Sequence, residues 1–249
     1  MKKNISRFDR TEQKYLLSMD DYRKLMDKLE NHLEEDEYFR SKIANIYLDD
    51  ELYSLISESM ERPVFKEKMR VRSYGSGKAF VEIKRKYKGQ VYKRRVAMTE
   101  CEAMDFVNLG RKPSGTTEAD CRIINEEEYF INFHKCRPMM YVAYDRISYK
   151  GRELPDLRIT FDTDVRYRKE KLSLTDTGTE TVILGAGLDF NDQDGRNLSD
   201  KKYIMEIKTN GALPLWLSEM LDSLKIYPAS FSKYANAYMH MKRGESNVR

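Results

Sequence analysis

Cysteine is scarce in this 249-residue sequence, which contains only Cys101, Cys121 and Cys136. An odd number of cysteines without a CxxC pair argues against a disulfide framework and a zinc site, and favours a reducing compartment. Long hydrophobic runs are also missing, because no segment approaches the roughly eighteen apolar residues of a membrane-spanning helix. The basic N-terminus runs straight into charged residues, without the apolar stretch of a signal peptide. We therefore expect a soluble cytoplasmic protein with no membrane span in this chain.

Net charge and histidine are low as well. The 45 Lys and Arg residues nearly balance the 41 Asp and Glu residues, which leaves a formal charge of +4. That charge is too small for binding driven by polycation attraction, so an anionic partner would have to recognise how the charges are arranged. Single-stranded nucleic acid is disfavoured, because carboxylates share strand faces with the cations. The three histidines lie on separate predicted helices, and no Ser-His-Asp arrangement can be built from them.

The remaining composition is that of one folded domain. Hydrophobic residues make up 40% of the chain, enough for a core despite 35% charged residues. We expect a single domain over residues 1–249, with its core at about 7–240. A polar stretch at 185–200 predicts a long surface loop, and a calcium loop starting at Asp189 is disfavoured because its sixth position is not glycine.

Hydrophobic periodicity predicts an α+β fold. Helical spacing and caps indicate helices at 18–33, 99–109, 117–134 and 214–224, and a last one beginning near Ser230. Alternation with a period of two indicates strands at about 10–16, 42–48, 66–74, 79–87, 91–98, 139–147, 157–162 and 202–208. The short turns at 75–78 and 88–89 require antiparallel hairpins. GSGK at 75–78 also lacks the full spacing of a phosphate loop.

Charged residues recur on one face of these strands, opposite an apolar face. The alternating sets include Arg10, Glu12 and Lys14; Lys66, Lys68, Arg70 and Arg72; Glu82, Lys84 and Lys86; Arg158, Thr160 and Asp162; and Glu206 and Lys208. If amphipathic helices cover the apolar faces, the charged faces line the inside of a closed eight-stranded barrel. So many like charges need an anion to neutralise them, so we expect a linear, densely anionic ligand. Glu12, Glu82 and Glu206 could supply oxygen ligands to a hard divalent metal.

Eight segments of the sequence resemble one known family. They are RTEQKY at 10–15, IYLD at 46–49, KEKMRVRSYG at 66–75, VEIKRKYKGQVYKRR at 81–95, AYDRISY at 143–149, LRITFDTDVRYR at 157–168, YIMEIKTNGALPLWL at 203–217 and SFSKYANAY at 230–238. In this order they resemble the polyphosphate polymerase domain of the vacuolar transporter chaperone (VTC) family, one of the triphosphate tunnel metalloenzymes. The resemblance covers about residues 7–240 and implies a tunnel-shaped antiparallel barrel.

The resemblance also implies roles for individual residues. Arg70, Arg72, Lys84, Arg158 and Lys233 would act on the transferred phosphate; Lys14, Lys68, Arg94 and Ser232 would bind substrate; and Glu206 would bind Mn²⁺ or Mg²⁺. Lys93 or Arg95 would replace Arg94 if the strand register were shifted by one. Ser59 stands where eukaryotic members carry a further arginine, so Arg62, Lys66 or Lys68 would have to compensate.

The implied activity is transfer of the γ-phosphate of ATP to a growing inorganic polyphosphate chain. A phosphate nucleophile is already ionised, so this reaction needs no general base. Two alternatives use nearly the same residues: hydrolysis of inorganic triphosphate or of a nucleotide, and binding of polyphosphate without turnover. The regulatory SPX domain and the membrane spans of the eukaryotic complex are absent from the sequence, and a membrane partner for the product stays open.

Overall fold

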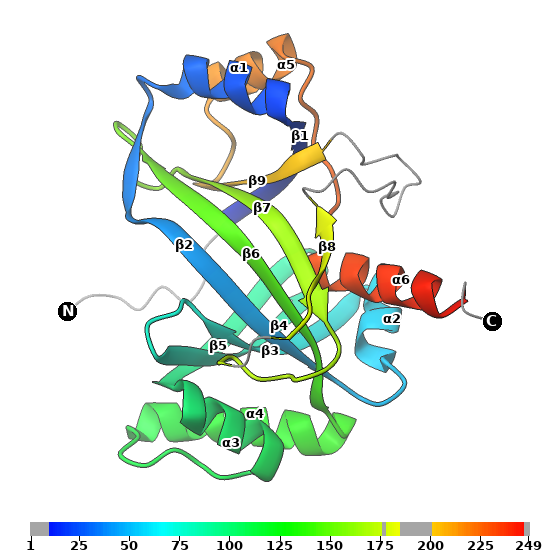
Figure 1. Ribbon diagram of the computed structural model, residues 1–249. Helices are drawn as coiled ribbons and strands as arrows, with labels where there is room; N and C mark the ends of the chain where they lie inside the picture. The colour runs from blue at the N-terminus through cyan, green and yellow to red at the C-terminus, as the bar shows by residue number, and fades with distance from the viewer. Residues whose placement is uncertain (1–9, 176–177, 185–200, 247–249) are drawn as a thin grey trace. The chain divides into compact units, whose positions relative to one another are not determined.

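The computed structural model describes residues 10–175, 178–184 and 201–246, so the loop predicted at 185–200 lies outside the described residues. In chain order the elements are β1 (Arg10–Ser18), α1 (Met19–Leu29), β2 (Leu33–Asp49), α2 (Ser54–Met60), β3 (Phe65–Ser73), β4 (Lys78–Tyr87), β5 (Gln90–Thr99), α3 (Glu100–Leu109), α4 (Glu118–His134), β6 (Arg137–Gly151), β7 (Arg158–Arg168), β8 (Thr181–Leu184), β9 (Lys201–Asn210), α5 (Leu215–Ser223) and α6 (Lys233–Ser246) (Figure 1). The α+β class and the antiparallel pairing of the sheet are as predicted.

All eight predicted strands and all five predicted helices are present, and the structure adds β8 and α2. Tyr53 precedes α2 with a φ of 59°, and its side chain makes no cap hydrogen bond. Instead the Asp49 carboxylate accepts hydrogen bonds from the backbone N–H groups of Leu55 and Ile56. The capping carboxylate belongs to the last residue of β2, so the sequence pattern before Ser54 does not predict this helix. Over the described ranges, no helix combines the length and apolar character needed to cross a bilayer.

The sheet is open, so the prediction of a closed barrel is wrong. Its strand order is β1-β9-β7-β6-β2-β3-β4-β5, with β8 beside β7, and β1 and β5 do not pair within the described ranges. At one edge the Ala229 N–H donates to the Lys14 carbonyl at 2.7 Å, and Tyr15 bridges to Pro228. This short segment occupies the outer edge of β1 that closure would need. Alternation shows which side of a strand is apolar, but it carries no information about what covers an edge.

The chain divides into two compact units, and we describe each by itself. The first unit comprises residues up to Ser41, Asp145–Val165 and Val182–Phe231; the second comprises Lys42–Tyr144, Arg166–Thr181 and residues from Ser232 onward. Strands β2, β6, β7 and β8 contribute residues to both. The expectation of a single domain therefore stays a prediction.

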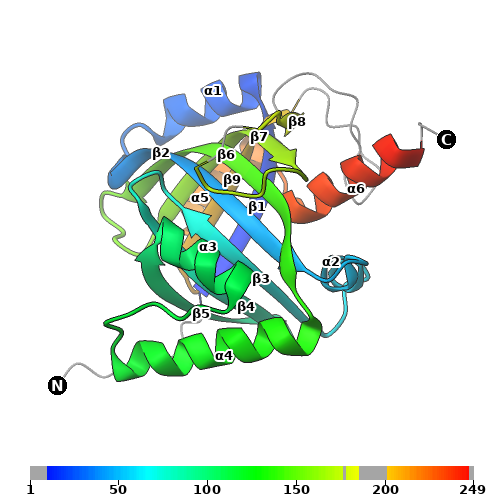
Figure 2. The same ribbon diagram turned by 60° about the horizontal axis from the view of Figure 1, so that its bottom comes forward.

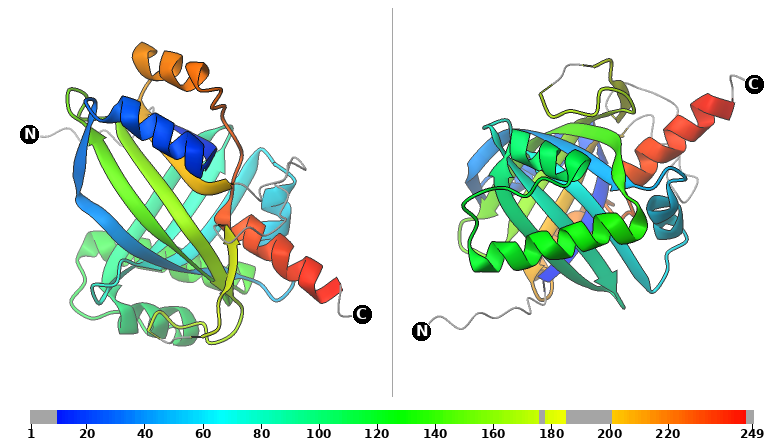
Figure 3. Two further views of the ribbon diagram at one scale, coloured as in Figure 1. Left: turned by 45° about the horizontal axis from the view of Figure 1, so that its top comes forward. Right: turned by 90° about the horizontal axis from the view of Figure 1, so that it is seen from below.

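In the second unit, α3 and α4 lie against one face of β3, β4 and β5 (Figure 2; Figure 3, right). Alternate apolar residues of the strands form the core on this face: Met69, Val71, Val81, Ile83, Val96 and Met98 pack with Ala103, Phe106, Ile124 and Phe130 of the helices. A capping box at Thr99 and Glu102 begins α3, and Gly110 ends it with a φ of 68°. The opposite face of these strands is left to the charged residues.

A carboxyl group is buried in this same helical layer. Glu127 of α4 is 0% exposed, and among the residues that the structure describes neither of its carboxylate oxygens has a hydrogen-bond partner. Burial raises the pKa of Glu127 to about 9, and the negative charges of Glu126 and Glu82 act in the same direction. Glu127 is therefore neutral in the folded protein at physiological pH, which makes it a point where stability depends on pH.

In the first unit, α1 and α5 lie side by side over β1 and β9 (Figure 1; Figure 3, left). A capping box at Ser18 and Asp21 starts α1. The core is made of Leu17, Leu25, Leu29, Phe161, Met205, Leu217 and Leu221. As in the second unit, the apolar strand face is covered by helices and the other face carries the charges.

Candidate functional site

A basic surface covers the face of β3, β4 and β5 that turns away from the helices. Residues directly opposite each other in antiparallel strands point to the same side. The register places Arg70 beside Glu82 and Glu82 beside Arg95, while Lys84 lies between Lys68 and Lys93. This face, called the basic face below, carries eight cations and one carboxylate: Lys66, Lys68, Arg70, Arg72, Lys84, Lys86, Lys93, Arg95 and Glu82. Its positive charge fits the linear anion expected from the sequence.

Arg94 does not belong to the basic face, so the structure does not bring it together with the other cations predicted to bind substrate. It lies opposite Ile83 in the ladder and donates a hydrogen bond to Glu126 of α4 at 2.9 Å. Lys93 and Arg95, the two alternatives, are on the basic face. The sequence held the signal for this, because Arg94 shares its parity with the buried residues Val96 and Met98.

The single carboxylate of the basic face, Glu82, is held by cations. It is 1% exposed, Arg70 contacts it through two nitrogens, and the Lys93 ammonium lies 2.6 Å from it. Burial alone would raise the pKa of Glu82, but the positive charges of Arg70, Arg72 and Lys93 outweigh burial and lower it to about 2. Glu82 is thus an ion-pair partner that fixes these cations, and the expectation that it serves a metal is not supported by its contacts.

The two arginines of β3 are held by neutral groups as well. Arg72 donates to the Asn45 side chain at 2.8 Å and to the Tyr144 hydroxyl at 3.2 Å. Arg70 donates to the Tyr47 hydroxyl at 3.4 Å. Tyr47 and Asn45 lie opposite Arg70 and Arg72 in the β2–β3 ladder, so a third strand orients both guanidinium groups. Such preorganisation favours binding of phosphate oxygens in fixed positions.

The predicted pair on the last helix lies close to the basic face. Ser232 precedes α6; its hydroxyl accepts from the Ala235 N–H at 3.3 Å and from the Lys68 ammonium at 3.2 Å. The next residue, Lys233, has its ammonium 4.3 Å from the centre of the Tyr144 ring. The structure thus brings Lys68, Arg70, Arg72, Lys84, Ser232 and Lys233 into one unit. Their catalytic or binding roles stay predictions.

Burial and neighbouring cations lower the pKa values of two lysines on the basic face. Burial lowers the pKa of Lys93 to about 8, with Arg70 and Arg72 acting in the same direction and Glu82 opposing them. At the other end of the face, burial and then the charges of Lys86 and Arg62 lower the pKa of Lys66. An anion bound here would relieve the repulsion, because it favours the charged form of each lysine.

We predict that tripolyphosphate affinity falls as the pH rises from 7 to 9, by up to roughly tenfold from the loss of the Lys93 proton alone. Below pH 8 the ammonium is charged and attracts the anion; above pH 8 it is neutral. Lys93→Arg should remove this part of the pH dependence, because a guanidinium stays charged over the whole range. Titration calorimetry at several pH values measures the effect. If the affinity of Lys93→Arg falls with pH as steeply as that of the parent, the prediction is wrong.

The charged face of the first unit is balanced instead of basic. Lys14 lies opposite Glu206 and Glu12 opposite Lys208 in the β1–β9 ladder, and the Lys208 ammonium is 2.8 Å from Glu206. On the same face, Arg146 forms a bidentate pair with Asp162 through hydrogen bonds of 2.6 and 2.8 Å. The predicted catalytic residue Arg158 donates to Asp36, which also accepts from Ser148. Three of the predicted site residues, Lys14, Arg158 and Glu206, therefore belong to this unit.

Glu206 is a buried carboxylate surrounded by cations, and its predicted role as a metal ligand stays a prediction. It is buried, and although burial opposes ionisation, Lys208, Lys14 and Arg146 hold the pKa of its carboxyl well below the usual range. Glu12 is its diagonal neighbour on the same face. Within the described ranges, no three His, Cys, Asp or Glu residues are grouped to form a metal cage. One or two carboxylates fit an ion of the Mg²⁺ type, which completes its shell with phosphate oxygens and water.

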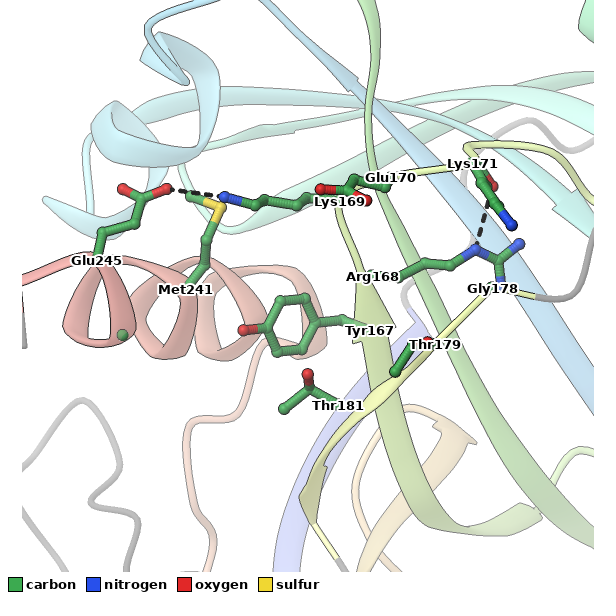
Figure 4. A pocket seen from close by; sticks show the side chains of 11 residues that line it. Tyr167, Arg168, Lys169, Glu170, Lys171, Gly178, Thr179, Thr181, Met241 and Glu245 are labelled. Atoms are coloured by element: carbon green, nitrogen blue, oxygen red, sulfur yellow. Dashed lines mark hydrogen bonds and ion pairs between the residues drawn. The ribbon is translucent and has the colours of Figure 1, made fainter. Parts of the chain in front are cut away.

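A cavity of about 860 Å³ lies in the second unit, between the end of β7, the residues that follow it and α6 (Figure 4). Sequence reasoning did not predict it. Arg168 organises this region, because it donates to the carbonyls of Lys171 and Ser173 and to Glu180, and stacks on Tyr141. Lys169 contacts Glu245 of α6 at 3.4 Å. The charges lining the cavity are mixed, which sets it apart from the basic face.

A solved structure shares this fold. A crystal structure of a candidate adenylate cyclase from Bacillus halodurans has a TM-score of 0.50 at 14% identity and covers 89% of this chain and 92% of its own. A Pyrococcus horikoshii OT3 protein is similar with a TM-score of 0.45 at 11% identity, and the match covers 93% of this chain and 99% of that protein. A candidate adenylate cyclase from Vibrio parahaemolyticus is similar with a TM-score of 0.43 at 10% identity, and the match covers 93% of this chain and 98% of that protein. Among curated proteins, no sequence matches this chain. The chain therefore shares its fold with the Bacillus halodurans protein.

The sequence profile of the VTC domain matches residues 9–242. The chain belongs to the VTC domain family, which confirms the resemblance carried by its eight motifs.

Proposed function

We propose that this protein is an ATP-dependent polyphosphate polymerase, which transfers the γ-phosphate of ATP to the end of a polyphosphate chain. The observation that carries the proposal is the basic face, where eight cations and one carboxylate lie on three neighbouring strands. Lys68, Lys84 and Lys93 form one row across these strands, and the next row contains Arg70 and Arg95. Rows of this kind suit a ligand with regularly repeated negative charge.

The carboxylate of the basic face cannot serve as a general base, which favours a phosphate nucleophile over water. Its carboxylate, Glu82, has a pKa lowered to about 2 and is bound by Arg70 and Lys93, so it cannot accept a proton near neutral pH. Hydrolysis would have to activate water, whereas a terminal phosphate of polyphosphate is already ionised. In this proposal Arg70, Arg72, Lys84 and Lys233 stabilise charge on the transferred group.

The remaining predicted residues bind substrate or metal in the same proposal. Lys68, Ser232, Lys93 and Arg95 bind phosphate oxygens in the second unit. In the first unit, Lys14 and Arg158 are proposed phosphate ligands, and Glu206 with Glu12 would hold Mn²⁺ or Mg²⁺. When bound, the ion would neutralise charge on phosphate oxygens. We place the activity in the cytoplasm.

Purified protein incubated with ATP and Mn²⁺, followed by separation of the products by size, tests the proposal. Long acid-labile chains together with ADP support a polymerase. Free phosphate without chains would instead establish a hydrolase of the same fold. Unchanged ATP combined with tight binding of polyphosphate would establish a binding protein that lacks turnover.

A separate prediction concerns the metal ligand. Glu206→Gln keeps the size of the side chain but removes the charge that a hard cation requires. We expect the Mn²⁺ concentration for half-maximal rate to rise at least tenfold, and Mn²⁺ binding measured by calorimetry to weaken in parallel. Polyphosphate should still bind, because the variant removes a negative charge. Glu34→Gln, whose carboxylate pairs with Lys150 in the same unit, is the control. Identical metal curves for Glu206→Gln and the parent would exclude Glu206.

A further inference from the structure

A stacked pair of tyrosines connects the start of α6 to the basic face. The rings of Tyr47 in β2 and Tyr234 in α6 are nearly parallel, with an angle of 6° and centroids 4.3 Å apart. Tyr47 in turn accepts a hydrogen bond from Arg70, which lies opposite it in the ladder. The first turn of α6 is therefore linked to Arg70 through one aromatic contact and one hydrogen bond.

Tyr234, the α6 member of the pair, is fixed by a buried carboxylate. The Tyr234 hydroxyl donates to Asp49 Oδ2 at 2.9 Å, and Tyr234 is only 2% exposed. Asp49 also accepts the backbone hydrogen bonds of Leu55 and Ile56 that begin α2. With its hydroxyl held at one end and its ring face against Tyr47, Tyr234 has one well-defined orientation. It directly follows Lys233 in sequence, so the same anchor fixes the position of that cation.

We propose that the Tyr47–Tyr234 stack is a positioning element that couples the placement of α6 to the orientation of Arg70. The inference rests on the proposed function, because it assigns these tyrosines a role in preparing the basic face for phosphate. Neither tyrosine contacts phosphate through this role: Tyr47 orients Arg70, and Tyr234 orients Tyr47 and the first turn of α6. A small rotation of α6 would therefore change the orientation of Arg70 and the position of Lys233 together.

Another aromatic contact of α6 provides a matched control. Tyr238, one turn further along, packs on Tyr53 with centroids 5.2 Å apart and accepts a hydrogen bond from Ser57 of α2. This contact ties α6 to α2 and to Tyr53, whereas the Tyr47–Tyr234 stack leads to Arg70. A purely structural role for aromatic packing on α6 predicts similar effects at Tyr234 and Tyr238; a positioning role predicts different ones.

The test compares Tyr47→Phe, Tyr234→Phe, Tyr234→Leu and Tyr238→Leu in the full chain. The first readout is the set of NMR signals of the Arg70 guanidinium group in the free protein, whose Nη1 donates to Tyr47 and whose Nε donates to Glu82, assigned with Arg70→Lys. The second is the affinity for tripolyphosphate, measured by calorimetry. We expect Tyr47→Phe and Tyr234→Leu to shift the Arg70 signal and to weaken binding roughly three- to tenfold, the effect of one lost hydrogen bond. Combining them should add little to either alone.

Tyr238→Leu should lower the melting temperature and leave both the Arg70 signal and the affinity unchanged. The inference is overturned if Tyr238→Leu shifts the Arg70 signal as much as the Tyr234 variants do. It is also overturned if that signal is the same in Tyr47→Phe, Tyr234→Phe and the parent, a comparison that holds even where Tyr234→Leu does not fold. A parent that binds no tripolyphosphate would refute the proposed function, while the Arg70 signal would still decide the positioning role.

Discussion

Single replacements by methionine along Lys93, Arg94 and Arg95 are expected to give alternating effects on tripolyphosphate affinity. Lys93→Met and Arg95→Met should each weaken binding about tenfold or more, and the double variant at least roughly 100-fold, because a hydrogen bond to a charged group contributes about 1.5–3 kcal/mol. Arg94→Met should leave the affinity within about twofold. All three single changes remove one positive charge from adjacent positions of β5, so net charge cannot account for a difference between them.

Binding should be measured by calorimetry at constant pH and ionic strength, because affinities of this kind fall as salt increases. Arg94→Met should lower stability slightly, through the loss of its contact with Glu126. Lys93→Met leaves Glu82 with Arg70 as its partner, so thermal unfolding of each variant must accompany the binding data. Equal losses at all three positions would mean that long-range charge governs binding and that the strand face does not matter.

The second large effect is expected in stability: Glu127→Gln should make the protein less sensitive to rising pH. The pKa of Glu127 is raised from 4.5 to about 9 in the folded protein, so between these values the folded state retains a proton that the unfolded state has lost. Stability therefore decreases with pH across this window, by about 1.4 kcal/mol per pH unit for one group. At pH 7.5 the free energy of unfolding is therefore about 4 kcal/mol lower than under acid conditions, through this one group.

Chemical denaturation of the parent and Glu127→Gln at pH 5, 6, 7 and 8 gives the measurement. The difference in unfolding free energy between the two proteins should grow in favour of the variant by about 1.4 kcal/mol per pH unit. Glu126→Gln, the neighbouring position, is the control: its carboxylate pairs with Arg85 and Arg94, so this variant should lose stability without that slope. A parent and Glu127→Gln with parallel pH profiles would show that Glu127 is ionised in the folded protein.

Much of the fold follows from local sequence patterns. The capping boxes at Ser18 and Thr99 begin helices where the sequence predicts them, because a cap depends on residues three positions apart. The alternation in β3, from Lys66 to Arg72, fixes which side of the strand is charged, because successive side chains point to opposite faces. The same rule applied to Val96 and Met98 would have placed Arg94 on the helix side. The family resemblance alone implies Arg94, and the structure places Lys93 and Arg95 on the basic face instead.

Other features depend on groups far apart in the chain, and only the tertiary structure decided them. The sheet stays open partly because Pro228 and Ala229 cover the edge of β1 at Lys14 and Tyr15. Asp49, at the end of β2, anchors the hydroxyl of Tyr234, 185 residues away. Sequence alternation specified a basic face, because side-chain direction is a local property of a strand. The partners of each cation depend on which strands become neighbours, and that is set when the whole sheet packs.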